Sequence, residues 1–256
     1  MAENNTRHRR VGATETSFDI IEILQQNEGT TVTEMAAELN VAKSTVHNHL
    51  QTLCDLGYVF VDDGEYHVGL RFLGLGVQAR QRHGLYEPAK PETDELVETV
   101  GERAQVMVEE DGMGIYIYQA RSDQSVRTDS YIGSTVALHI TSVGKAYLAF
   151  LPEERREEII DSIPLDARTP NSETDPEVLR AELETIRNRG YAFNDEERII
   201  GMRAVGAPIL AEDDEVLGSI SVSGPTTRVK GDRFRETLPQ EVMRAAKVIG
   251  VRTSYS

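Results

Sequence analysis

The sequence has few residues of several kinds, and each shortage excludes a class of protein. Its single cysteine, Cys54, excludes an intrachain disulfide and a cysteine-rich zinc site. No stretch approaches the roughly 18 consecutive apolar residues of a membrane span. Residues 1–10 are polar, without the apolar core of a signal peptide. We therefore expect a cytoplasmic protein with no membrane partner, no metal site and no cofactor.

Basic residues are also scarce. The chain has 27 Lys and Arg but 43 Asp and Glu, so its net charge is -16. Such a charge repels nucleic acid unless the surface is segregated. Only five of the bases are lysines, and this excess of acids and Arg over Lys resembles proteins from organisms with molar salt in the cytoplasm. Solvent adaptation is our hypothesis. The alternative, which composition alone favours, is an acidic protein that simply avoids nucleic acid.

What is present indicates a two-domain globular protein. A chain of 256 residues exceeds the roughly 100 to 200 residues of one domain. Apolar residues make up 39% of it, enough to build real cores. Residues 1–83 hold seven bases and eleven acids, a net of -4, which leaves -12 for residues 84–256. The first third is thus the less acidic part of the chain.

The first 69 residues show the pattern of a winged helix-turn-helix. Apolar residues at helical spacing predict three helices, the first with Phe18, Ile21 and Leu24 on one stripe. Two short strands follow around an Asp-Gly turn. The expected ranges are 17–27, 34–39, 43–56, 58–61 and 66–69. Thr31 and Glu34 form a capping box at the second helix, and Gly57 is suited to the end of the third. We expect a mainly α-helical domain with a β-hairpin wing over residues 1–69.

A linker helix is predicted over residues 70–83, where the helical pattern continues despite Gly74 and Gly76. The remainder, residues 84–256, mixes helical and β-rich segments, which predicts an α+β domain. Its helices are expected near 91–103, 142–151, 152–162, 176–190 and 233–251, and its strands near 105–109, 115–120, 126–139, 204–210 and 216–223.

The third helix separates its residues into two faces. Val46, Leu50 and Leu53 recur at the spacing of one buried stripe. The exposed positions carry side chains that hydrogen-bond bases or phosphates. The proposed DNA contacts are Lys43, Ser44, Thr45, His47, Asn48 and Gln51. Such folds insert this helix into the major groove, so double-stranded DNA is the expected partner. A winged helix that binds protein remains the alternative.

Segments of both domains resemble the IclR family of transcription regulators. In the first domain and linker the resemblance covers residues 31–61 and 66–76. In the second domain it covers LHITSVGKAYLAFL (138–151), GYAFNDEERIIGMRAVGAPI (190–209) and GSISVSGP (218–225). The resemblance implies a homodimer or homotetramer that binds a promoter palindrome. It also implies a GAF-like second domain that binds a small-molecule effector and thereby controls catabolic genes.

Two departures from the family pattern affect specificity. Members often have arginine where Asn48 stands, so the base recognised there is expected to be adenine rather than guanine. Members often have cysteine at the positions of Ile140 and Ala204, and in some of them the second lines the ligand pocket. We therefore expect a different pocket wall, and a different effector, in this chain.

The candidate effector site begins at the helix expected from residue 142. Free amides and the helix dipole at Ser142, Val143 and Gly144 favour an anion, such as a small carboxylate or sugar acid. The resemblance adds Ala204 and the side chains of Asn194, Ser221 and Ser223. Asp195 and His139 are neighbours with weaker claims, and His139 is interpreted as a packed strand histidine. An ordinary helix cap beside locally bonded serines is the alternative reading.

No nucleophile and base stand out together, so no catalytic residue is assigned and an enzyme is not expected. A small-molecule enzyme or a protein-interaction module fused to a winged helix is the alternative function. Lys145 lacks the glycine-rich loop of a phosphate site and is interpreted as structural or interfacial. Cys54 is interpreted as a small core residue. Arg7, Arg9 and Arg10 form either a DNA-binding arm or a disordered tail.

Overall fold

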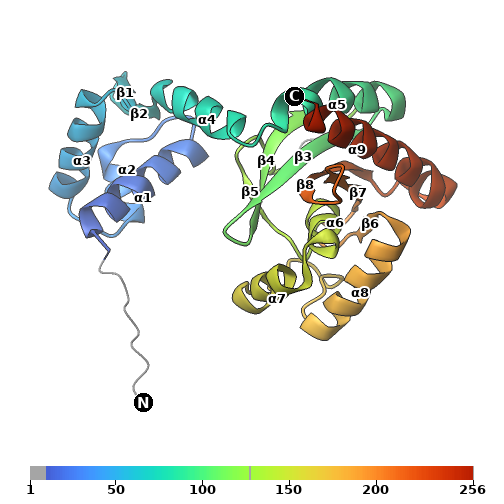
Figure 1. Ribbon diagram of the computed structural model, residues 1–256. Helices are drawn as coiled ribbons and strands as arrows, with labels where there is room; N and C mark the ends of the chain where they lie inside the picture. Colours follow the sequence, from blue (N-terminus) through green and yellow to red (C-terminus); the bar gives the residue numbers. More distant parts are fainter. Residues whose placement is uncertain (1–9, 127, 256) are drawn as a thin grey trace, which may run out of the picture. The chain divides into compact units, whose positions relative to one another are not determined.

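The computed structural model describes residues 10–126 and 128–255. The chain forms two compact units that part between Ala79 and Arg80 (Figure 1). The division lies inside helix α4 (Arg71–Gln81), within the range expected for the linker helix. Each unit has a hydrophobic core of its own.

The first unit is a winged helix-turn-helix, as predicted. It consists of α1 (Gly12–Gln26), α2 (Val32–Glu38), α3 (Lys43–Asp55), and the antiparallel wing strands β1 (Val59–Asp62) and β2 (Glu65–Val68). Helix α1 begins earlier than the expected Ser17, and Phe18, which we expected on the buried stripe, is 57% exposed. The buried positions of α1 are Ile20, Ile23 and Leu24.

Local sequence signals set the ends of these elements. The Thr31 hydroxyl accepts a hydrogen bond from the Glu34 amide at 3.4 Å, and the Glu34 carboxylate accepts one from the Thr31 amide at 2.8 Å. This reciprocal capping box starts α2 and lowers the pKa of Glu34 through the bond to the Thr31 backbone. The wing turns at Asp63 and Gly64, which both have positive φ and so match the twist of a hairpin.

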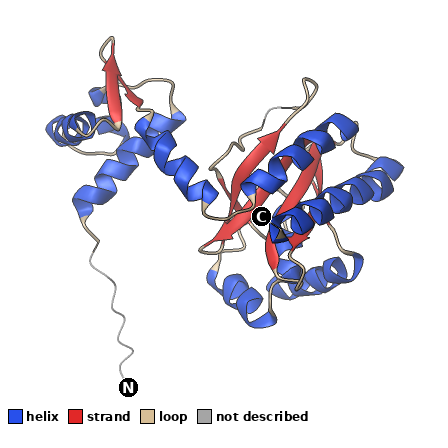
Figure 2. Ribbon diagram, turned by 45° about the horizontal axis from the view of Figure 1, so that its top comes forward, coloured by secondary structure: helices blue, strands red, loops and turns tan. Residues whose placement is uncertain are grey.

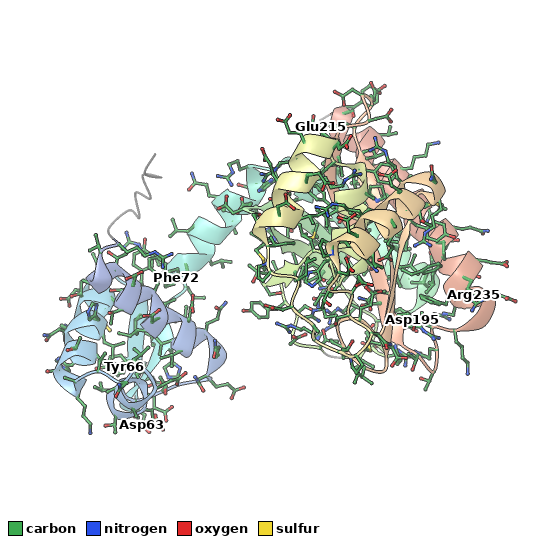
Figure 3. The ribbon with its side chains drawn as sticks, turned by 90° about the horizontal axis from the view of Figure 1, so that it is seen from below. Asp63, Tyr66, Phe72, Asp195, Glu215 and Arg235 are labelled. Carbon is green, nitrogen blue, oxygen red and sulfur yellow. The ribbon has the colours of Figure 1, made fainter. Side chains whose placement is uncertain are left out.

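The core of this unit holds α3 by one face. Val46, Leu50 and Leu53 are buried, as predicted, and pack with residues of α1, α2 and β1. Figure 3 labels Asp63 and Tyr66 on the wing, and wing strand β1 packs against α3. Because one face of α3 is fixed in the core, its opposite face is presented to solvent.

The second unit is an α+β domain, as predicted. Its strands are β3 (Arg103–Glu110), β4 (Met113–Ala120), β5 (Thr135–Ala137), β6 (Ala192–Asp195), β7 (Met202–Leu210) and β8 (Val216–Pro225). They form an antiparallel sheet in the order β5-β4-β3-β8-β7-β6. Its helical elements are α5 (Tyr86–Val100), α6 (Ser142–Phe150), α7 (Glu153–Ser162), α8 (Pro176–Arg189), the π-helical turn η1 (Arg233–Thr237) and α9 (Leu238–Ser254).

Helices cover both faces of this sheet (Figures 1 and 2). On one face α5 and α9 pack against alternate strand residues, among them Val106, Val205 and Val222. On the other face α6 packs against β7 and β8, and α8 packs against α6. Because side chains alternate along a strand, the second face receives the residues between those of the first. That second face carries most of the polar residues described below.

Four expectations for the second unit differ from the structure. The helix expected near 91–103 is α5, Tyr86–Val100, because Gly101 at φ 69 ends it, and Arg103 begins strand β3. Only Thr135–Ala137 forms a strand within the expected range 126–139, because Gly133 turns the chain at φ 90 and Ser130 bonds a distant arginine. His139 therefore lies in a turn and not in a strand. Strand β6 was not expected, since it is a short segment closely preceded by the helix-ending Gly190.

Candidate nucleic-acid interface and effector cavity

All six proposed DNA-contacting side chains are exposed on α3: Lys43, Ser44, Thr45, His47, Asn48 and Gln51. The helix is preceded by Ala42, which provides no side-chain cap. The first amides of α3 are therefore left to interact with an anion such as a DNA phosphate. No acidic residue lies in the first turn. The end of α3 that enters the groove in such folds thus carries no repelling charge.

Two side-chain contacts fix the position of α3 and of Gln51, one of its proposed DNA contacts. The Gln51 amide donates to a carboxylate oxygen of Asp55 at 2.9 Å. This bond uses one N–H, so Gln51 keeps a second N–H and its carbonyl oxygen, the pair needed to grip the adenine edge. His49 lies 2.8 Å from the Ser17 hydroxyl, a contact that ties α3 to α1. His49 thus positions the helix and is not one of the proposed base contacts.

Of the three N-terminal arginines, Arg10 lies within the residues that the structure describes. Arg7 and Arg9 lie outside the described residues. Arg10 approaches Glu15 of α1 at 3.2 Å, as an exposed ion pair of small energy. The role of this segment at DNA therefore stays a prediction.

Replacing Lys43 with alanine is expected to weaken binding to all DNA sequences alike, because a lysine at this end of α3 attracts phosphates. The slope of log affinity against log salt is negative, and its magnitude should decrease by about 1 in this variant. Fluorescence anisotropy over a series of KCl concentrations measures the slope. Lys90→Ala, the same substitution on α5, is the matched control. Equal slopes for the two variants would show that Lys43 does not contact DNA phosphates.

In the second unit, strand register brings distant residues into two polar rows. Residues paired across antiparallel strands share one face of the sheet. The first row, across β3, β8, β7 and β6, is Arg103, Ser223, Ala204 and Asn194. The second row is Gln105, Ser221, Gly206 and Ala192. Three of the residues expected from the resemblance thus lie side by side with Arg103.

Helix α6 begins directly above these rows because two glycines allow a close approach. A Cβ atom on Gly206 would lie 2.6 Å from the carbonyl carbon of Ser142, and one on Gly144 would overlap the Leu138 backbone. The Asn194 amide donates to the Ile140 carbonyl at 2.5 Å, and the Ser219 hydroxyl donates to the Val143 carbonyl at 2.8 Å. The N-terminus of α6 is therefore fixed on the polar face of the sheet.

A cavity opens between the α6 N-terminus and the polar rows. It contains about 440 Å³ of empty space, its open mouth included. Six of the eight proposed effector contacts line it: Ser142, Val143, Asn194, Ala204, Ser221 and Ser223. The structure brings these residues together although they come from α6 and three strands.

Gly144 and Asp195 do not line the cavity. The Gly144 amide donates to the Thr141 hydroxyl at 3.1 Å, so the cap of α6 already satisfies it. Asp195, labelled in Figure 3, is exposed and pairs with Arg203 through a 2.6 Å contact. Strand alternation turns its carboxylate away from its neighbour Asn194. We therefore leave both residues out of the proposed site.

Arg103 is a cavity residue that the sequence analysis missed. It is 4% exposed and donates to the hydroxyls of Thr128 and Ser130 at 2.5 and 2.6 Å and to the Gln105 amide oxygen at 2.9 Å. Burial lowers the pKa of its guanidinium. The signal was available in the alternation of Arg103 and Gln105 with the apolar Ala104 and Val106, which assigns two polar side chains to one face.

Arg198, which lines the cavity, forms an ion pair that joins two loops. One guanidinium nitrogen of Arg198, in the loop after β6, contacts both carboxylate oxygens of Asp129, at 2.8 and 2.9 Å. Asp129 stands between Thr128 and Ser130, whose hydroxyls bond Arg103. The segment that holds Arg103 is thus joined to a segment that lines the cavity.

Lys145 is a buried structural cation, in agreement with its interpretation from the sequence. Its Nζ lies 2.7 Å from a Glu182 oxygen and 2.7 and 2.8 Å from the two Glu197 oxygens. It thereby joins α6, α8 and the loop that carries Arg198. Burial raises the pKa of Glu197, and the charge of Lys145 opposes that shift.

His139 is buried and lies outside the cavity lining. Its Nε2 is 3.2 Å from the Asp166 carbonyl oxygen, so this nitrogen carries the proton. Its Nδ1 is buried without a hydrogen-bond partner among the described residues. Burial lowers the pKa of the ring, and a neutral imidazole fits this environment.

The buried His139 predicts a pH-dependent loss of stability. Because its folded pKa lies below its unfolded value of 6.5, protons bind the unfolded chain more readily. Stability should therefore fall as pH drops from 6.5 through the lower folded pKa. Urea unfolding of His139→Gln should show a weaker fall in this window than wild type, with His47→Gln at an exposed position as control. Identical pH profiles for wild type and His139→Gln would contradict the assignment.

The described residues contain no group of three or more His, Cys, Asp or Glu placed to hold a metal ion. Within the same residues, no helix combines the length and the apolar character that crossing a membrane requires. Cys54 is half-buried against the core of the first unit, and burial raises the pKa of its thiol.

A winged helix-turn-helix joined to an α+β domain with a polar cavity defines the class of two-domain DNA-binding regulators. The protein-family model "Bacterial transcriptional regulator IclR C-terminal" matches residues 77–251. A second family model, "Winged helix-turn-helix DNA-binding", matches residues 14–59. The chain belongs to the IclR family, whose members are transcription regulators and not enzymes.

Individual relatives agree with this assignment. A "Probable HTH-type transcriptional regulator ArcR" of Halobacterium salinarum is 36% identical over 98% of this chain and 97% of its own length. The crystal structure of the Thermotoga maritima IclR matches with a TM-score of 0.80 and 28% identity, over 96% of this chain and all of that one. An IclR homologue from Microbacterium hydrocarbonoxydans, solved with 4-hydroxybenzoate, shares the fold with a TM-score of 0.80 at 22% identity, over 95% and 100% of the two chains.

Proposed function

We propose that this protein is a sequence-specific transcription regulator that reads promoter DNA with α3 and responds to a small organic acid in the cavity of its second unit. The observation that carries the proposal is the exposed stripe of α3. There Asn48 and Gln51 are exposed and can reach bases, while the opposite face is fixed in the core.

The proposed effector contacts are Ser142, Val143, Asn194, Ala204, Ser221 and Ser223. The α6 N-terminus, two serine hydroxyls and an amide are groups that bind oxygen atoms of a ligand. The Microbacterium homologue was solved with an aromatic acid, which supports an acid as the effector class. A small carboxylate or sugar acid is therefore our choice, and genes for its catabolism are the proposed targets.

The remaining proposals concern assembly and environment. A homodimer or homotetramer would place two copies of α3 on a palindromic operator. Because its partner is genomic DNA, we place the protein in the cytoplasm. The relative from Halobacterium supports reading the net charge of -16 as adaptation to high salt. Phosphate contacts weaken as salt rises, so base contacts and oligomer avidity would carry more of the affinity.

Selection of genomic fragments tests the proposed function. The purified protein is mixed with fragments of its own genome in molar KCl, and the retained DNA is sequenced. We expect a few promoter sites that share a palindrome, beside genes that nominate the effector. Retention of nothing above background by folded protein would overturn DNA binding and favour a protein-interaction module.

A further inference from the structure

Arg103 carries a buried positive charge without a carboxylate of its own. Its three hydrogen-bond acceptors, Thr128, Ser130 and Gln105, are neutral groups. Its Nε is buried with no hydrogen-bond partner among the described residues. The side chain nevertheless lines the cavity. Neutral acceptors orient a guanidinium but leave its charge uncompensated in a region of low dielectric.

The charge pattern around the cavity is the reverse of that of the whole protein. The chain has 43 acidic residues, yet the described lining includes three arginines and no Asp or Glu. Two of them have carboxylate partners, since Arg198 pairs with Asp129 and Arg203 with Asp195. Asp129 also attracts Arg103, but both of its oxygens are engaged by Arg198. Arg103 is thus the lining arginine that no described carboxylate pairs with.

We propose that Arg103 is the charge receptor of the effector and binds its carboxylate. This inference rests on the proposed function of the cavity and specifies how its ligand is held. A guanidinium has five N–H groups, and the bonds to Thr128, Ser130 and Gln105 leave two of them, including Nε–H, for ligand oxygens. An incoming carboxylate would supply the missing counter-charge, and charge-assisted bonds of this kind are the stronger ones.

The geometry also assigns an orientation to the ligand. Arg103 is on β3, whereas the α6 N-terminus sits above Gly206 on β7, two strands away and about 10 Å across the sheet. A guanidinium carries a full charge and a helix N-terminus about half of one. The carboxylate therefore faces Arg103, and a neutral oxygen at the other end faces the amides of Ser142 and Val143. Hydroxy acids and hydroxy-aromatic acids fit this description.

Acid and amide pairs test the inference on the wild-type protein. The probes are 4-hydroxybenzoate and gluconate, each compared with its primary amide by calorimetry in KCl at neutral pH. The amide keeps the shape of the acid and removes its charge. We expect any acid that binds to do so roughly 10- to 100-fold more tightly than its amide. Equal affinities would overturn the role of Arg103.

Two variants and a control test whether the preference for the acid over its amide depends on Arg103. Arg103→Gln should weaken binding of the acid roughly 10- to 100-fold and leave the amide unchanged. Arg103→Lys keeps the charge but not the forked donors, so its affinity for the acid should lie between those of wild type and Arg103→Gln. Arg121→Gln is the control, because Arg121 adds positive charge near Arg103 but does not line the cavity. Thermal unfolding of each variant confirms that it is folded.

The outcomes separate this inference from the proposed function. An acid could bind Arg103→Gln as tightly as wild type but fail to bind the double variant Ser221→Ala, Ser223→Ala. The cavity would then be the effector site, and the proposed role of Arg103 would be wrong. If no acid of the panel binds, and operator DNA is still bound, the organic-acid effector class is overturned together with this inference.

Discussion

Replacing Asn48 and Gln51 together with alanine is expected to abolish most sequence-specific DNA binding without unfolding the protein. Both side chains are exposed, so their removal leaves the buried stripe of Val46, Leu50 and Leu53 intact. Each bidentate contact to a base contributes about 1–3 kcal/mol of discrimination, so the double variant should lose roughly 2–6 kcal/mol. Titration of a labelled operator, with circular dichroism to confirm the fold, measures this loss.

The matched control replaces Gln25 and Gln26 on α1, which are also exposed. This control should bind the operator close to wild-type affinity. Wild-type affinity of the double variant on α3 would show that this stripe does not read DNA, and the winged helix would then be better interpreted as a protein-binding module.

Replacing Lys145 with methionine is expected to cause the largest loss of stability. The substitution keeps much of the volume but leaves the carboxylates of Glu197 and Glu182 without their shared cation. Removing one partner of a buried ion pair costs about 3–5 kcal/mol. Glu182 is the more exposed of the two and retains part of its hydration, so Glu197 should account for most of the loss. Urea unfolding at neutral pH measures it.

The pH dependence of this loss identifies its cause. Burial already raises the pKa of Glu197 in the folded protein, and removal of Lys145 should raise it further. A carboxyl with a raised folded pKa destabilises the protein as pH increases from the unfolded value towards the folded one. The difference between Lys145→Met and wild type should thus shrink on acidification, and adding Glu197→Gln should recover part of the lost stability. A difference independent of pH would indicate lost packing instead.

Local signals explain why the first unit was predicted well. Helix ends follow from contacts a few residues apart, such as the capping box of Thr31 and Glu34, and the hairpin follows from Asp63 and Gly64. The buried face of α3 follows from helical spacing alone. Phe18 was misplaced because the helical pattern of α1 offers several apolar positions, and only packing against α3 and β2 selects among them.

The cavity was only partly predictable because it depends on long-range register. The α6 N-terminus is a local feature, so Ser142 and Val143 were identified from spacing and resemblance. Arg103 is joined to Thr128 and Ser130, 25 and 27 residues away, and lies opposite Ser223 on another strand. No local pattern specifies such pairs. Alternation along β3 assigns Arg103 to a face of the sheet but not to a partner.

The central claim is that α3 distinguishes one DNA sequence from others. It is tested most directly by the ratio of two affinities, for a selected operator and for a scrambled duplex of the same composition, measured at one fixed KCl concentration. We expect the operator to bind at least about 1,000-fold more tightly, as specific regulators do. Equal affinity for the two duplexes would contradict the account.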